Sequence, residues 1–212
     1  MRLRNVKNAV NIVNNSDYVI KDPFKFKGKY KSLFGNNNPI IIEVGMGKGD
    51  FIIGEATKYP DINFIGIEKY ESVMVRAIQK LEDVNLPNLK LIRMDAERIE
   101  DVFDHEIETI RLNFSDPWPK NKHEKRRLTS PVFLSKYDAI FSGNPHIIQK
   151  TDNINLFAYS LSSLSKFGYT LNYVSLDLGN EDIPNIETEY EKKFKSLGVK
   201  INYLDAVKYQ EK

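Results

Sequence analysis

The sequence predicts an α/β protein built around one mostly parallel β-sheet. Between residues 39 and 207, short apolar runs rich in β-branched residues alternate with segments of helical periodicity. This alternation is typical of a parallel sheet covered by helices. A glycine-rich turn at residues 45–49 directly follows the first apolar run. The last two predicted strands are expected to form an antiparallel pair at one edge of the sheet.

The individual elements are predicted from apolar spacing and from the turn residues between them. The expected strands are residues 40–44, 63–67, 89–93, 109–114, 146–149, 169–177 and 199–207. The expected helices are residues 51–58, 70–82, 96–103, 131–141, 155–165 and 187–196. In the second helix, Val73, Ala77 and Leu81 recur on one face. Pro131 suits the first turn of the fourth helix, and Gly198 suits the turn after the last one.

The length of 212 residues fits one domain with one core. Residues 1–38 lack steady periodicity and run into the turn at 35–39, so we expect a basic N-terminal extension at 1–38 and the main domain at 39–212. The polar, basic start does not resemble a signal peptide, and no apolar run approaches the ~20 residues of a membrane span. The absence of cysteine excludes disulfides and thiolate chemistry. We expect a cytoplasmic protein with no membrane contact and no metal.

Positive charge is concentrated in two segments. Residues 1–31 hold eight Lys or Arg against two Asp, and residues 120–127 hold five against one Glu. The net charge of the whole chain is only +2, so the remainder is acidic. One basic run alone would more simply be solvated surface. Two of them on an acidic body indicate a specific polyanionic partner.

Four acidic residues are expected to meet at one edge of the sheet. Glu43, Glu68, Asp95 and Asp116 lie at or near the ends of the first four predicted strands. Ligands of such sheets bind outside the carboxyl ends of the strands. A carboxylate at Glu68 can accept hydrogen bonds from both ribose hydroxyls of an adenosine. The alternative is that Glu68 and Asp95 only cap strand ends in solvent.

The glycine spacing distinguishes between two adenosine-containing cofactors. Gly45, Gly47 and Gly49 let the backbone approach a ligand closely. The dinucleotide motif needs its third glycine one residue later, where this chain has Asp50, and an acid at the helix start would repel a pyrophosphate. Glu43 suits a cationic ligand. S-adenosylmethionine has an amino group and a sulfonium but no phosphate, so we expect it rather than a nicotinamide dinucleotide.

The segment 113–120, with the sequence NFSDPWPK, is the most informative stretch of the chain. Pro117 and Pro119 flank Trp118, the only tryptophan, and stiffen a loop that also carries Asp116. A rigid acid beside a flat aromatic ring suits an unstacked nucleic-acid base. The basic run that follows suits the phosphates around that base. Alternatively, Trp118 is a core anchor and Asp116 a turn residue.

With these residues the chain resembles the bacterial tRNA (guanine-N7)-methyltransferases. The matching segments are 42–49 (IEVGMGKG), 115–127, 150–153 (KTDN) and 188–194 (TEYEKKF). The resemblance covers nearly the whole chain, including the basic start at Arg2 and Arg4. It implies a Rossmann-like fold, S-adenosylmethionine as the methyl donor and tRNA as the partner. It also implies N7 of a guanine as the target, at position 46 of the variable loop. Monomer and homodimer both remain open.

The resemblance also implies roles for individual residues. At the cofactor it implies Glu43, Gly45, Gly47, Glu68, Asp95 and Asp116. At the target guanosine it implies Lys120, Asp152, Thr188, Glu189, Tyr190 and Glu191. At the RNA backbone it implies Lys122, His123, Glu124, Lys125, Arg126 and Arg127. The catalytic position is that of Asp116.

Two positions depart from the family pattern. Asn121 stands where a basic residue is expected, which puts one phosphate contact in doubt. Ala158 stands where an acidic residue is expected, and we expect this to change only a helix surface.

Methylation at N7 makes few chemical demands, because this nitrogen already carries a free lone pair. We expect the enzyme to act by positioning the base and by placing the Asp116 carboxylate near the positive charge that develops. His123 is not needed as a base. We expect it to contact RNA, and the alternative is an ordinary surface histidine. The alternative classes of protein are a nicotinamide oxidoreductase and an RNA-binding module without catalysis. Asp50 and the glycine spacing argue against the first, and the acids on four strand ends argue against the second.

Overall fold

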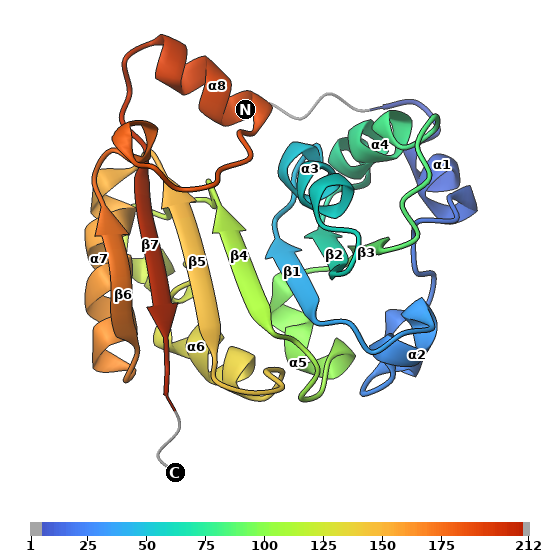
Figure 1. The fold of residues 1–212 in the computed structure, drawn as a ribbon, viewed down its shortest axis with the longest axis horizontal. Coiled ribbons are helices and arrows are strands. Elements are labelled where there is room, and N and C mark those ends of the chain that lie inside the picture. Colours follow the sequence, from blue (N-terminus) through green and yellow to red (C-terminus); the bar gives the residue numbers. More distant parts are fainter. Residues whose placement is uncertain (1–5, 210–212) are drawn as a thin grey trace.

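The computed structural model describes residues 6–209, and Figure 1 shows their arrangement around one sheet. The strands are β1 (Ile40–Val44), β2 (Asn63–Glu68), β3 (Leu89–Arg93), β4 (Thr109–Asn113), β5 (His146–Thr151), β6 (Thr170–Ser175) and β7 (Asn202–Val207). Their order in the sheet is β3-β2-β1-β4-β5-β7-β6. Strands β1 to β5 are parallel, and β7 runs antiparallel to both of its neighbours. The predicted α/β architecture and its antiparallel edge pair are confirmed.

Helices cover both faces of this sheet. The α-helices of the described part are α1 (Ala9–Asn15), α2 (Tyr30–Phe34), α3 (Asp50–Lys58), α4 (Glu71–Lys80), α5 (Ile99–Val102), α6 (Pro131–Asp138), α7 (Ile154–Lys166) and α8 (Glu189–Ser196). The 3-10 helices are η1 (Pro23–Phe26), η2 (Ala96–Arg98), η3 (Asn121–Arg126) and η4 (Leu178–Asn180). One face packs against α1, α3 and α4, and the other against α5, α6 and α7.

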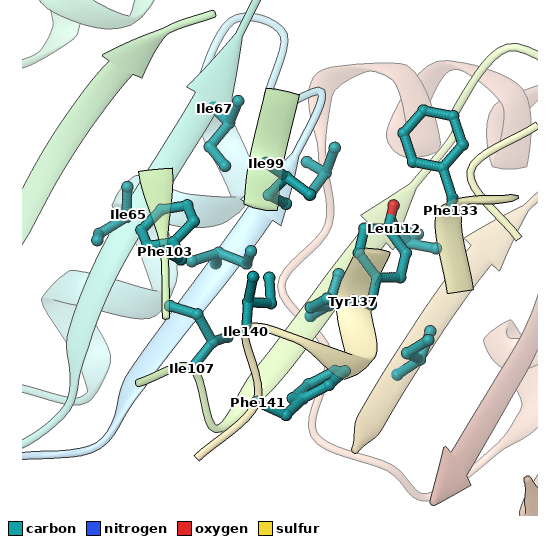
Figure 2. Packing of buried hydrophobic residues seen from close by; sticks show 14 of the residues in the cluster. Ile65, Ile67, Ile99, Phe103, Ile107, Leu112, Phe133, Tyr137, Ile140 and Phe141 are labelled. Atoms are coloured by element: carbon teal, nitrogen blue, oxygen red, sulfur yellow. The ribbon is translucent and has the colours of Figure 1, made fainter. Parts of the chain in front are cut away.

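The period of two along each strand divides the core between these faces. In β1, Ile40 and Ile42 join the cluster under α5, α6 and α7, whereas Ile41 joins the cluster under α3 and α4. Figure 2 shows the larger cluster, in which Phe103 and Tyr137 are among the bulkiest buried side chains. Burial on both faces is what makes the strands of a parallel sheet continuous apolar runs.

The strand register brings the carboxyl ends of the parallel strands to one edge. Val44 of β1 pairs with Ile67 of β2, and Asn113 of β4 pairs with Lys150 of β5. In Figure 1 the arrowheads of β1, β4 and β5 all point toward the edge at which α8 lies. Residues that follow these strand ends therefore lie around a common space.

The described part of the N-terminal segment packs onto the sheet. Helices α1 and α2 have only seven and five residues, too few for a clear periodic pattern. Val19 forms a parallel bridge with Leu91 of β3, and Tyr30 is completely buried. The boundary between residues 38 and 39 stays a prediction. Arg2 and Arg4 lie outside the described residues.

The helix predicted at 131–141 ends earlier than expected. It is α6, and it stops at Asp138. Ile140 and Phe141 continue the apolar pattern, but they are buried in a turn, and Phe141 forms a parallel bridge with Ile107. These two residues are apolar because they are buried in the core, and not because they belong to the helix.

Gly49 has a conformation and a contact that exclude larger residues. Its φ is +79°, and a Cβ atom there would lie 2.8 Å from the Cβ of Ala77. We expect Gly49→Ala to lower the free energy of unfolding by about 2–5 kcal/mol, because the left-handed conformation costs about 1–2 and overpacking about 1–3. Urea denaturation measures this loss. Gly143→Ala is the control, since its Cβ meets open space, and it should change stability by less than about 0.5 kcal/mol. Equal losses for the two variants would contradict the prediction.

Candidate active site

A cavity of about 770 Å³ lies at the carboxyl ends of β1 to β4. Its polar side includes Glu68, Lys69, Asp95, Asp116 and Arg126. Its apolar side includes Val44, Ile67, Val73, Met94, Phe114, Trp118 and Phe133. Three of the four acids expected to converge at strand ends therefore line one space, together with the backbone of Gly45.

Glu68, the last residue of β2, is held by three backbone N–H groups. Lys69 and Tyr70 donate to its Oε1 at 2.8 and 3.0 Å, and Gly47 donates to its Oε2 at 3.1 Å. Burial raises the pKa of the carboxyl, and the three N–H groups oppose that rise. Glu68 thus joins the glycine-rich turn to the start of α4. This is the place of Gly47 in the site: it supports Glu68 through its amide.

Asp95 follows β3 and has two partners of its own. Its carboxylate accepts a hydrogen bond from the Glu97 amide at 3.1 Å and forms an ion pair with Lys69. Burial acts to raise the pKa of Asp95, but the hydrogen bonds from Lys69 and the Glu97 amide, together with the charge of Lys69, outweigh it and the pKa is lowered. Asp95 is therefore an ionised cap of η2 that also faces the cavity.

The loop after β4 has an unusual backbone. Phe114 and Trp118 have φ values of +52° and +41°, although neither is glycine. Such conformations cost of order 1–3 kcal/mol each and persist only where surrounding contacts hold them. Asp116 lies between these two residues and is exposed at the cavity. The Trp118 ring is half-buried, with the Arg126 guanidinium 4.8 Å from its centre, so it is not a core anchor.

Glu43 lies beneath the cavity and is not one of the described residues that line it. Its side chain is 2% exposed, and Asn113 donates to its Oε1 at 2.8 Å. Burial raises the pKa of Glu43 to about 8, while Asn113 and the nearby charge of Lys150 act in the opposite direction. Glu43 is therefore mainly neutral at pH 7. It supports the end of β1 from within the sheet.

Lys150 at the end of β5 forms a buried ion pair with Glu191 of α8. The Nζ–Oε2 distance is 2.7 Å, and the two side chains are 3% and 1% exposed. The same ammonium donates to Oδ1 of Asn185 at 2.9 Å and to the carbonyl of Ile186 at 3.0 Å. Burial lowers the pKa of Lys150, and Glu191 opposes that shift. The ion pair closes α8 and the chain before it over the strand ends.

The residues assigned to the target guanosine take different places along this segment. Tyr190 donates to Asp152 at 3.1 Å, and its ring lies 4.9 Å from that of Phe114. Thr188 caps α8 by accepting from the amide of Glu191. Glu191 itself is enclosed by its ion pair and is not at the surface. Tyr190 and Asp152 thus adjoin the loop of Asp116 through Phe114.

Other contacts join this segment to the glycine-rich turn. Glu189 forms an exposed ion pair with Lys48 at 2.6 Å. A Cβ atom at Gly54 of α3 would lie 2.7 Å from Cγ2 of Ile186, so this glycine makes room for the segment. Asp50, at the start of α3, is paired with Lys80 at 2.6 Å.

The side chains of the basic run at residues 120–127 fall into two groups, one exposed to solvent and one half-buried against the neighbouring loop. The solvent-exposed residues are Lys120, Asn121, Lys122, Glu124, Lys125 and Arg126. His123 is half-buried with its ring 5.7 Å from that of Trp118. Arg127 is half-buried and donates to backbone carbonyls of the 116–118 loop. Ala158 lies on the exposed surface of α7, as expected.

Several residues of this site are not among those expected from the sequence. Lys69 pairs with Asp95, Asn113 supports Glu43, and Lys150 holds Glu191. Lys69 directly follows a strand end, so its position could have been predicted. The partners of Asn113 and Lys150 depend on which strands are neighbours, which a single sequence does not reveal.

Comparisons with known proteins identify similar sequences and a similar fold. A sequence profile of the family described as "Putative methyltransferase" matches residues 37–204. A tRNA (guanine-N(7)-)-methyltransferase of Bacillus subtilis is 52% identical over 88% of this chain and 89% of its own length. One of Lachnoclostridium phytofermentans is 48% identical over the full length of both chains. The solved structure of the 16S rRNA methyltransferase KamB superposes with a TM-score of 0.67 over 86% of this chain and 94% of its own, at 13% identity, and shows the shared fold.

The profile match over residues 37–204 defines this chain as a methyltransferase. Within that class it belongs to the family of bacterial tRNA (guanine-N7)-methyltransferases. Among residues 6–209, no group of three or more His, Cys, Asp or Glu is placed to hold a metal ion. No helix of the described chain is long and apolar enough to cross a membrane.

The buried ion pair generates a stability prediction. Lys150→Met removes the cation and leaves Glu191 buried beside its remaining partner, Asn185. We expect the free energy of unfolding to fall by about 3–5 kcal/mol, the usual cost of leaving one buried charge unpaired. Lys25→Met is the control, because the pair of Lys25 and Asp22 is exposed and should contribute less than about 1 kcal/mol. Denaturant unfolding of both variants measures the difference, and similar losses would contradict the prediction.

Because the pKa of Glu43 is raised, we expect the stability of the fold to depend on pH. A carboxyl whose pKa is about 8 in the folded state and 4.5 in the unfolded state stabilises the fold fully below pH 4.5, and that contribution is lost as the pH rises to about 8. Glu43→Gln is always neutral at this position. The free energy of unfolding of Glu43→Gln minus that of the unsubstituted protein should therefore be larger at pH 8.5 than at pH 5. The expected increase is more than about 1 kcal/mol, the scale of one pKa unit. Guanidinium denaturation at the two pH values tests this. A stability difference that is equal at both pH values would show that Glu43 is ionised throughout.

Proposed function

We propose that this chain transfers a methyl group from S-adenosylmethionine to N7 of a guanine in tRNA. The observation that carries the proposal is the single cavity lined by Glu68, Asp95 and Asp116, with Trp118 and Arg126 at its side. The names of the relatives support the substrate. By family resemblance, the target is guanosine 46 of the variable loop. Since tRNA is the substrate, we propose the cytoplasm as the location.

The cavity has the chemistry that S-adenosylmethionine requires. Glu68 lies at the end of β2. Its Oε2 accepts only the Gly47 amide and retains acceptor capacity for a ribose hydroxyl, whereas Oε1 already accepts two backbone N–H groups. Ile67, Val73 and Met94 offer apolar surface to a flat base. The carboxylates of Asp95 and Asp116 add negative charge, which suits a ligand with a positive sulfonium. When bound, the cofactor supplies an electrophilic methyl group.

Glu43 would act on the cofactor indirectly. Its neutral carboxyl and Asn113 fix the end of β1, from which Gly45 leads into the cavity. Gly47 would act in a similar way, through its hydrogen bond to Glu68.

The protein residues would act on the guanine mainly by position and charge. N7 has a free lone pair, so no residue has to remove a proton. Trp118 offers a half-buried ring beside Asp116, on which the extruded base can stack. The carboxylate of Asp116 would stabilise the positive charge that forms on the methylated ring. Tyr190 and Asp152 would border the guanosine from the side of β5, joined to this loop through Phe114.

The outward-facing cations would bind the RNA backbone. Lys120, Lys122 and Lys125 are exposed on and beside η3, next to the proposed base site. Contacts of this kind orient nucleic acid without reading its sequence. Asn121 is exposed in the same helix, so this enzyme would lack one cation that the family pattern has there.

Methylation of unmodified tRNA tests the proposal directly. The purified protein is incubated with S-adenosylmethionine and a transcribed tRNA that has guanosine at position 46, and the nucleosides are analysed by mass spectrometry. We expect 7-methylguanosine, and none with a tRNA that has adenosine at that position. Methylation of a different atom would overturn the proposed target. No methylation of any tRNA would overturn the function.

Asp116→Asn tests the electrostatic role of the carboxylate. Asparagine keeps the size and most of the hydrogen-bonding shape but removes the negative charge. We expect the rate at saturating cofactor and tRNA to fall by about 10²–10³, the scale for loss of one preorganised electrostatic group. Binding of tRNA should change little, because exposed lysines supply it. Single-turnover methylation measures the rate, and a near-normal rate would leave positioning as the sole source of catalysis.

A further inference from the structure

Arg127 is bonded to the loop that carries Asp116. Its Nε donates to the carbonyls of Pro117 at 3.2 Å and Trp118 at 3.3 Å, and its Nη2 donates to the carbonyl of Trp118 at 3.1 Å. The side chain is half-buried, whereas Lys122 and Lys125 of the same basic run are exposed. Nε and Nη2 of Arg127 are thus directed at the protein backbone.

The Arg127 guanidinium also contacts Tyr159 of α7. It lies 4.2 Å from the ring centre of Tyr159, at a distance typical of a cation–π contact. The Tyr159 hydroxyl donates to Glu124 at 2.9 Å, which ties this ring to η3. Arg127 therefore connects the loop after β4 with a regular helix on the sheet.

The loop needs such a connection because its backbone is strained. Trp118 has a φ of +41°, and the flanking residues Pro117 and Pro119 have no N–H groups with which to hold the loop. Carbonyl oxygens are therefore the main polar groups through which this part of the backbone can be fixed. Arg127 uses two consecutive carbonyls, those of Pro117 and Trp118.

We propose that Arg127 is a positioning residue for the methylation reaction and not a contact for RNA phosphate. It acts through the backbone of Pro117 and Trp118, and so fixes where the Asp116 carboxylate and the Trp118 ring lie. The task requires arginine, because the planar guanidinium can donate to two acceptors and lie flat on a ring, whereas the lysine ammonium is a point charge. The catalytic part of this role rests on the function proposed above, but the structural part does not.

Arg127→Lys tests the proposal, because it keeps the charge and removes the planar donor group. Trp118 is the only tryptophan, so tryptophan fluorescence, excited at a wavelength that tyrosine does not absorb, reports on this loop. In the free protein we expect a shifted emission maximum and stronger quenching by acrylamide. With tRNA we expect kcat to fall by about 10- to 100-fold, as for a misplacement of about 1 Å, with little change in KM.

Two further variants define the comparison. Lys125→Gln removes an exposed cation of the same run and should raise KM for tRNA without altering the Trp118 emission. Tyr159→Leu removes the ring beneath Arg127 and should shift the emission in the same direction as Arg127→Lys, to a smaller extent. Circular dichroism verifies that each variant is folded, and Tyr159→Leu carries the test if Arg127→Lys is not.

The outcomes separate the two proposals. Wild-type emission and kcat in Arg127→Lys, with a raised KM for tRNA in Arg127→Gln, would overturn the positioning role and make Arg127 a phosphate contact. Altered emission together with lowered kcat supports it. Altered emission in Arg127→Lys, with no methylation of tRNA by the unsubstituted protein, would support the fixing of the loop and overturn the proposed function.

Discussion

Lys150 carries a positive charge into the protein interior at the end of β5, and the arrangement of the site follows from how that charge is balanced. An ammonium 3% exposed requires an anion and full hydrogen bonding, and Glu191 of α8 provides the anion. Nearby, Arg111 lies 3.7 Å from Glu55 of α3. Because Glu43 is neutral, the cations of Lys150 and Arg111 are balanced by the carboxylates of Glu191 and Glu55. The C-terminal segment therefore has to fold back over the strand ends, where it borders the proposed guanosine site.

The acids at the cavity could be predicted from the sequence because parallel strands end at a common edge. Glu68, Asp95 and Asp116 each lie at or just beyond a strand end, so the register alone brings them together. Glu43 is the last but one residue of β1 and pairs with Gly66, two residues before Glu68 on β2. By the alternation of side chains it shares a sheet face with Glu68, but it lies within the sheet and not at the strand end, so it does not line the cavity.

Contacts between distant segments could not be predicted in the same way. Lys150 and Glu191 are 41 residues apart, and their pairing depends on how α7, β6 and η4 return the chain to the strand ends. The basic run presents the opposite case, in which neighbours in sequence differ in environment. Within η3 only His123 is half-buried, and Lys125 is exposed. Arg127 comes just after the helix, where the backbone becomes extended, and its side chain faces the loop.

Phe114 connects the two sides of the proposed base site. Its amide donates to the carbonyl of Lys150 at 2.8 Å, and its ring contacts that of Tyr190. Its own φ of +52° begins the loop that Arg127 holds at Trp118. The segment anchored by the buried ion pair and the loop anchored by Arg127 thus meet at one residue. For a reaction that requires no proton removal from its target, rate depends on holding base and methyl group in line, and a site fixed from β4 and β5 together meets that requirement.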